Sequence, residues 1–149
     1  MNISPTTPQN DFYDWIDHNI TLLKQKQWAD IDIDILIDEL ESMAKRDKRE
    51  LISHFIVLIA HLLKWHSQPQ MQSGSWRGSI CEQRIRIHDQ LEDSPSLKNY
   101  LEISIEKAYP AALKIAHQET RLPISAFPVN CPYSINELLD EDFYPSEPK

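Results

Sequence analysis

Two side chains of the chain, Glu50 and His54, have the spacing of a half-built metal site. They are four residues apart, so on a helix they face the same side and could supply two ligands. His61 follows His54 by seven residues, a separation of about 10.5 Å along a helix axis, so these two imidazoles cannot share one ion. No H-x-x-x-H or H-E-x-x-H pattern is present. A further ligand would have to come from another helix, with His88 or His117 available, and we predict neither a bound metal nor a cofactor.

A second group of polar residues falls among apolar ones. Gln83 and Arg84 lie between apolar turns of a predicted helix, and a buried side chain of either kind needs a hydrogen-bond partner. Asp47 is the expected partner of Arg84, with Glu39 or Glu41 as alternatives. Together with His61, these residues form a predicted polar cluster, which comprises Asp47, His61, Gln83 and Arg84. We favour a structural lock between two helices over the alternative, the floor of a small-ligand site.

Aromatic residues flank the turn that precedes this helix. Trp65 and Trp76 lie on either side of it, and Arg77 beside Trp76 could add a cation–π contact. Tryptophans at such spacing are typical of a core. Stacking on nucleic acid would need more basic neighbours, so we treat these three residues as an aromatic corner rather than a nucleic-acid site.

Helical spacing of apolar residues positions all these groups. It predicts helices over residues 11–25, 34–66, 76–91, 95–120 and 135–140, and the chain has only two glycines, which argues against a fold rich in tight β-turns. The predicted caps are Asn10 or Asp11, Ser75, Ser94 ahead of Pro95, and a capping box of Ser134 and Glu137. Pro110 is expected to kink its helix.

The predicted buried positions follow the same spacing. The first helix should bury Phe12, Trp15, Ile16, Ile20 and Leu23, and Trp28 should pack down as a plug. The second should bury a stripe of residues 36, 40, 43, 51, 55, 58, 62 and 65. Its length of about 50 Å exceeds the roughly 38 Å diameter of a compact chain of this size, so we expect a kink or break at residues 44–48. In the proline-rich C-terminal segment, Phe127, Phe143 and Tyr144 should dock.

These expectations describe an all-α, single-domain helical bundle with one long, kinked second helix and an irregular C-terminal segment. We expect a flexible N-terminus over residues 1–9, one domain over residues 10–144 and a flexible C-terminus over residues 145–149. Two cysteines without a C-x-x-C pair, an N-terminus unlike a signal peptide and no long apolar run favour a cytoplasmic protein that does not enter membranes.

Charge is unevenly distributed along the chain. The net charge of −8 divides into −7 over residues 1–42, +3 over residues 43–121 and −4 over residues 122–149. An acidic chain lacks the electrostatic footprint of a nucleic-acid binder.

A series of short motifs runs in order along the chain: Asp11-Phe-Tyr-Asp-Trp15, Leu36-Ile-Asp-Glu-Leu-Glu-Ser-Met43, His61-Leu-Leu-Lys-Trp65, Ser75-Trp-Arg77, Ile80-Cys-Glu-Gln-Arg84, Asp93-Ser-Pro-Ser-Leu97, Phe127-Pro128, Cys131-Pro-Tyr-Ser134 and Leu138-Leu-Asp-Glu-Asp-Phe143. This series resembles one family of helical proteins frequent in cyanobacteria, the twenty-ninth of the numbered domains of unknown function. The resemblance implies a single all-helical domain and brings no activity, ligand or functional residue.

No catalytic motif accompanies these features, and the sequence favours a non-catalytic binding or interaction module. A protein partner or self-association is expected. The alternative is a metal- or small-molecule-dependent enzyme with a site near His61 and Arg84.

Overall fold

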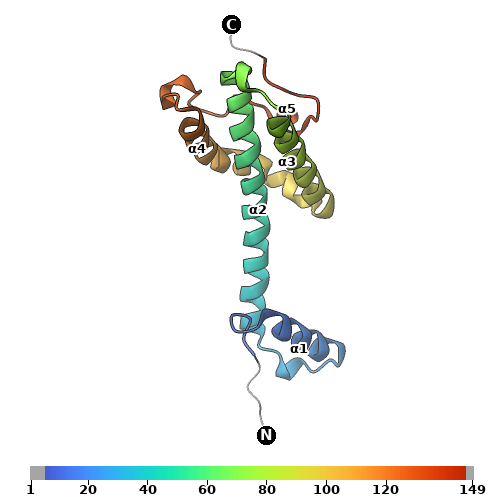
Figure 1. Ribbon diagram of the computed structural model, residues 1–149. Helices are drawn as coiled ribbons and strands as arrows, with labels where there is room; N and C mark the ends of the chain where they lie inside the picture. The colour runs from blue at the N-terminus through green and yellow to red at the C-terminus, as the bar shows by residue number, and fades with distance from the viewer. Residues whose placement is uncertain (1–5, 147–149) are drawn as a thin grey trace. The chain divides into compact units, whose positions relative to one another are not determined.

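The protein is all-α, as the sequence predicts. The computed structural model describes residues 6–146, and no strand occurs among them. Five α-helices follow one another, with short 3-10 turns between them (Figure 1). Their bounds are α1 Phe12–Lys24, α2 Ile33–Ser67, α3 Gly74–Asp93, α4 Leu101–Thr120 and α5 Ile135–Leu139.

The helices form two compact units, which meet within α2. One unit ends at Arg46 and the other begins at Asp47. The predicted break at residues 44–48 is wrong, because α2 is one α-helix of 35 residues. A single compact body of this chain length would be too small to contain so long a helix. The chain instead has two compact units, and each includes its own part of α2. Four of the five residues of this stretch are Ala, Lys or Arg, which are good helix formers and carry the helix through it.

The N-terminal unit contains α1 and the first turns of α2. The side chain of Asp11 caps α1 by accepting a hydrogen bond from the N–H of Asp14, as predicted. Asp32 caps α2 in the same way through the N–H of Ile35. The large hydrophobic side chains buried in this unit are Trp15, Leu22 and Ile31.

Several positions predicted to be buried in this unit are exposed instead. Ile20 and Leu23 of α1 are each 42% exposed, and Trp28, the predicted plug, is 57% exposed. Leu40 and Met43 of α2 are exposed as well. The helical spacing of these residues is correct, but two helices offer too little surface to cover every apolar position.

The C-terminal unit holds the main hydrophobic core. Residues of α2, α3 and α4 meet there, and Figure 1 shows α3 and α4 packed on the second half of α2. Leu51, Phe55, Leu58 and Leu62 of α2 are all fully buried, as the spacing predicts. Phe127 is buried and anchors the segment after α4, also as predicted.

Two of the predicted helix starts in this unit are wrong. Ser73, not Ser75, caps α3, accepting a hydrogen bond from the N–H of Trp76 at 3.2 Å. Ser94 makes no side-chain cap, because residues Pro95–Tyr100 form a 3-10 turn before α4 begins. Helix α4 then runs through Pro110 without ending. The capping box of Ser134 and Glu137 at α5 is confirmed.

The ends of the chain are only partly described. Residues 1–5 and 147–149, where flexible termini were expected, lie outside the described residues. Thr7 is half-buried, Pro8 is buried, and the Thr7 carbonyl accepts hydrogen bonds from the N–H groups of Asn10 and Asp11. Within residues 6–146, no helix has both the length and the apolar content needed to cross a membrane.

Candidate functional site

Arg84 lies in the core of the C-terminal unit, and its guanidinium group holds the end of α5. The residue is 1% exposed. Its Nε donates to the carbonyl of Leu138 at 2.9 Å, and its Nη2 donates to the carbonyl of Glu137 at 3.2 Å. The last carbonyls of a helix have no partner within the helix, and they carry partial negative charge. Arg84 is therefore a side-chain cap for α5.

His88 completes this cap from the next turn of α3. Its Nε2 donates to the carbonyl of Leu139 at 2.8 Å. Arg84 and His88 are four residues apart on one face of α3, so they reach three consecutive carbonyls of α5. Burial lowers the pKa of Arg84, whereas the nearby Tyr144 and Asp140 oppose that shift.

The predicted pairing of Arg84 with Asp47 is wrong. Asp47 instead offers its main-chain carbonyl, which accepts a hydrogen bond from Gln90 at 2.6 Å. Glu39, one of the alternatives, is paired with Arg46 in the N-terminal unit at 3.1 Å. A lock does exist, but it joins α3 to α5 rather than α3 to α2.

The other members of the predicted polar cluster are also separated. Gln83 Oε1 accepts a hydrogen bond from His54 Nδ1 at 2.9 Å. His61 Nδ1 donates to the carbonyl of Val57, one turn earlier in the same helix, at 2.9 Å. Gln83, His61 and Arg84 therefore have three different hydrogen-bond partners and do not form one cluster.

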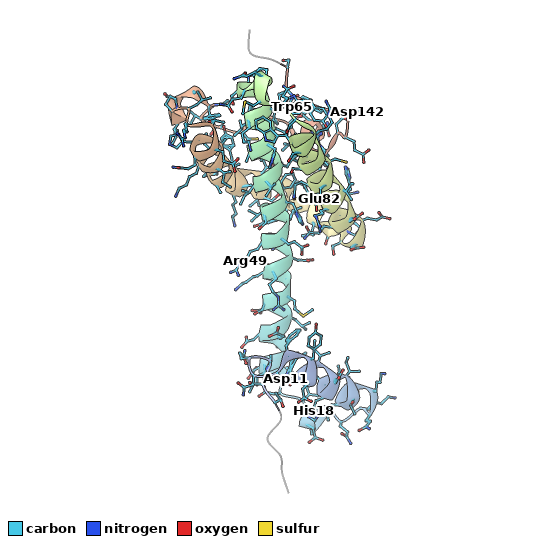
Figure 2. All side chains as sticks on the ribbon, in the orientation of Figure 1. Asp11, His18, Arg49, Trp65, Glu82 and Asp142 are labelled. Atoms are coloured by element: carbon cyan, nitrogen blue, oxygen red, sulfur yellow. The ribbon has the colours of Figure 1, made fainter. Side chains whose placement is uncertain are left out.

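Of the predicted aromatic corner, Trp65 and Arg77 lie together, and Tyr144 joins them in place of Trp76. The rings of Trp65 and Tyr144 are 4.9 Å apart, and the Arg77 guanidinium lies 5.2 Å from the first and 4.6 Å from the second. Trp76 instead receives Lys64, whose Nζ is 4.7 Å from the ring and also pairs with Glu119. Figure 2 shows Trp65 at the end of α2, where these contacts fix the returning C-terminal segment.

Glu50 and His54 do face each other, with 3.5 Å between Glu50 Oε1 and His54 Nε2. Within residues 6–146, no group of three or more His, Cys, Asp or Glu side chains is arranged to hold a metal ion. The contact is an ion pair only when His54 is protonated, because Nδ1 donates to Gln83 and a neutral ring then has no proton on Nε2.

A cavity lies between α4 and the segment that leads into α5. It has a volume of about 680 Å³, and Glu102, Glu106, Tyr109, Cys131 and Tyr133 are among its lining residues. Burial raises the pKa of Tyr109 to about 12, and it raises those of Tyr133 and Cys131 as well. These three groups are therefore uncharged near neutral pH. Neither His61 nor Arg84 lines this cavity.

The most unusual surface belongs to the N-terminal unit. Among the described residues, fourteen large hydrophobic side chains are exposed, and eight of them lie before Asp47. We call these eight the N-terminal apolar surface. They are Tyr13, Ile20, Leu23, Trp28, Ile33, Ile37, Leu40 and Met43.

The cap of α5 and the N-terminal apolar surface were not predicted from the sequence, for different reasons. Nothing in the sequence marks the carbonyls of Glu137 and Leu138 as acceptors, because every residue carries the same carbonyl. The N-terminal apolar surface had a signal, its helical spacing, but spacing alone does not distinguish a buried stripe from an exposed one.

Comparison with known proteins gives a family and no function. Neither a curated protein nor a solved structure matches the chain. One family model, described as a domain of unknown function, matches residues 9–144, which include all five helices. The chain therefore belongs to the DUF29 family.

Proposed function

We propose that this protein is a non-catalytic interaction module whose N-terminal apolar surface binds a helix of another protein chain. The observation that carries the proposal is an imbalance within one unit. The N-terminal unit buries three large hydrophobic side chains and exposes eight. Among the eight, Ile33, Ile37 and Leu40 lie on one face of α2, and contiguous exposed apolar surface marks interaction sites in folded proteins.

The energetics favour coverage of this surface. Ile33, Trp28 and Leu40 are each more than half exposed. Complete burial of a fully exposed side chain of this kind contributes about 1.5–3 kcal/mol, so covering the exposed half of each contributes roughly half of that. Several of them together would offset the cost of ordering a short partner helix, which is about 2–5 kcal/mol.

The polar groups of the C-terminal unit support a structural role for that unit. Arg84 and His88 hold the end of α5, and Gln90 holds a main-chain carbonyl of α2. Side chains engaged in this way position helices and do not face a substrate.

The proposal is tested by capture of partner proteins from the native lysate, with two double variants compared. Ile37→Ser with Leu40→Ser alters the N-terminal apolar surface. Ile85→Ser with Ile103→Ser alters similarly exposed isoleucines of the C-terminal unit, which are 49% and 44% exposed. All four side chains are exposed, so both variants should keep the helical content of the wild type in circular dichroism.

We expect the wild type and the Ile85/Ile103 variant to retain the same partner, and the Ile37/Leu40 variant to lose it. Retention by all three proteins, or equal loss in both variants, would contradict the proposal. Sedimentation of the purified protein identifies the case in which the bound chain is a second copy.

A further inference from the structure

We propose that the partner of the N-terminal apolar surface is a basic amphipathic helix, which binds along the first turns of α2. This inference rests on the proposed function and adds the chemistry of the partner. It has two independent supports, the spacing of the apolar residues and the charge beside them.

The apolar residues in these turns form a single stripe. Ile33, Ile37, Leu40 and Ala44 follow one another at intervals of four, three and four residues, which places them on one face of α2. The first three are 54%, 46% and 55% exposed. Stripes with this spacing are the surfaces that pack against another helix.

The same spacing shows what kind of element covers such a stripe elsewhere in α2. Leu51, Phe55, Leu58 and Leu62 repeat the intervals of four, three and four, and all are fully buried in the helical core of the C-terminal unit. Within the N-terminal unit, the buried residue of these turns is Glu39, which lies on a different face of α2. The stripe from Ile33 to Ala44 therefore has the form of a helix-packing surface without its helix.

A row of carboxylates runs beside the stripe. Asp34, Asp38 and Glu41 each directly follow one of its first three residues, so all three are turned about 100° from it toward the same side. Lys45 follows Ala44 at the far end of this edge, which therefore carries three acidic groups and one basic group. All three are exposed, and among the described residues none of them forms an ion pair. An approaching helix would meet these carboxylates at one edge of its contact.

The charge of the unit selects the partner. Residues 1–46 contain four Lys or Arg against nine Asp or Glu, a net charge of −5. A second copy would bring an equally acidic surface against this one, and like charges across an interface oppose binding. A helix with apolar residues at three- and four-residue intervals and Lys or Arg beside them satisfies both the stripe and the carboxylate row.

Two synthetic peptides test the inference. Each is a fluorescein-labelled helix of about 18 residues with leucines at three- and four-residue intervals, one with Lys and one with Glu at the remaining positions. Binding to the full-length protein is measured by fluorescence anisotropy at low and high salt. We expect the Leu/Lys peptide to bind at least about tenfold more tightly than the Leu/Glu peptide, with affinity that falls as salt is added.

Matched charge variants distinguish binding at the carboxylates beside the stripe from general electrostatic attraction to an acidic protein. Asp34→Asn with Asp38→Asn should weaken binding of the Leu/Lys peptide by about threefold or more. Glu102→Gln with Glu106→Gln removes another exposed acidic pair of the same spacing, on α4, and should leave the affinity unchanged. Equal effects of the two variants would overturn the inference.

The remaining outcomes distinguish this inference from the proposed function. Equal affinity for both peptides, lost in the Ile37→Ser, Leu40→Ser variant, would overturn the basic partner and leave the interaction surface in place. If the wild type self-associates and the Ile37→Ser, Leu40→Ser variant does not, the partner is a second copy of this chain, and the basic partner is overturned. Binding that is absent, or unaffected by this variant, would overturn both proposals.

Discussion

Arg84 illustrates how one desolvated charge can define a local structure. Its side chain is almost fully buried, and two of its nitrogens donate to main-chain carbonyls of α5. Its third nitrogen, Nη1, is buried without a hydrogen-bond partner in the described residues, and the guanidinium carbon lies 5.7 Å from the ring of Tyr144. Its hydrogen bonds go to the end of a helix, and among the described residues it forms no salt bridge with a carboxylate.

Arg84→Met should lower the free energy of unfolding by about 2–4 kcal/mol, because the carbonyls of Glu137 and Leu138 lose charged donors and stay at least partly buried. Replacing a buried ion pair with apolar residues can be neutral, but here the acceptors belong to the main chain and cannot be replaced. Urea denaturation measures the change.

Arg86→Met is the matched control for this variant. Arg86 is exposed and pairs with Glu82 on the surface, so its loss should cost about 0.5 kcal/mol or less. Equal stability of Arg84→Met and the wild type would show that the cap of α5 contributes nothing.

The burial of Arg84 could be predicted from the sequence, but its partner could not. Its place between apolar turns of α3 indicates a buried residue in need of a partner. Side-chain types then suggest a carboxylate such as Asp47, because a main-chain carbonyl leaves no trace in residue identity. Tyr144 was predicted to dock, yet its place beside Trp65 and Arg77 depends on how the last segment returns to α2.

At the scale of the helices, two serines near the start of α3 have different roles, although either could be its N-cap from the sequence alone. Ser73 is the N-cap, with an extended backbone and a side chain that accepts from the N–H of Trp76. Ser75 lies two residues later, already inside α3, and is exposed. Serine is therefore expected to stabilise α3 at position 73 and to destabilise it slightly at position 75.

Ser73→Ala should lower the free energy of unfolding by about 1 kcal/mol, because the first turn of α3 loses its cap. Ser75→Ala should leave stability unchanged or raise it by a few tenths of a kcal/mol, since alanine is the better helix former. Thermal or urea unfolding of the two variants side by side decides the point. A larger decrease in the free energy of unfolding for Ser75→Ala than for Ser73→Ala would show that Ser75 is the N-cap of α3.

Helix boundaries were predictable where a cap has two reciprocal parts. The capping box of Ser134 with Glu137 marks α5 in this way. A single serine before a helix is weaker evidence, as Ser94 shows: it precedes a 3-10 turn, and α4 begins only at Leu101. Local spacing predicted these helices well, but their first residues depend on turns that it does not resolve.

At the scale of the whole molecule, the two units differ in how much core each contains. The C-terminal unit contains twenty buried hydrophobic residues in one cluster, whereas the N-terminal unit buries three. Small units with little buried surface are marginally stable unless a partner covers them. The helical spacing of α2 could not reveal this difference, because the intervals are the same where the stripe is covered and where it is open.

Amide hydrogen exchange should therefore be uneven along the chain. We expect amides of residues 12–24 and 33–46 in the isolated protein to exchange at least about tenfold faster than those of residues 51–63, since local opening exposes less apolar surface there. Mass spectrometry of peptic fragments measures these rates. Equal protection in the two parts of α2 would mean that the N-terminal unit is as stable as the core.

The cap of α5 also has a consequence for biosynthesis. The carbonyls that Arg84 binds lie 53 and 54 residues further along the chain. While a ribosome is still making the last segment, α3 is complete but its guanidinium group has no acceptor, so it must stay hydrated. The core around Arg84 can close only after Glu137 and Leu138 have emerged, so folding of this unit finishes only after the segment that follows α4 has been translated.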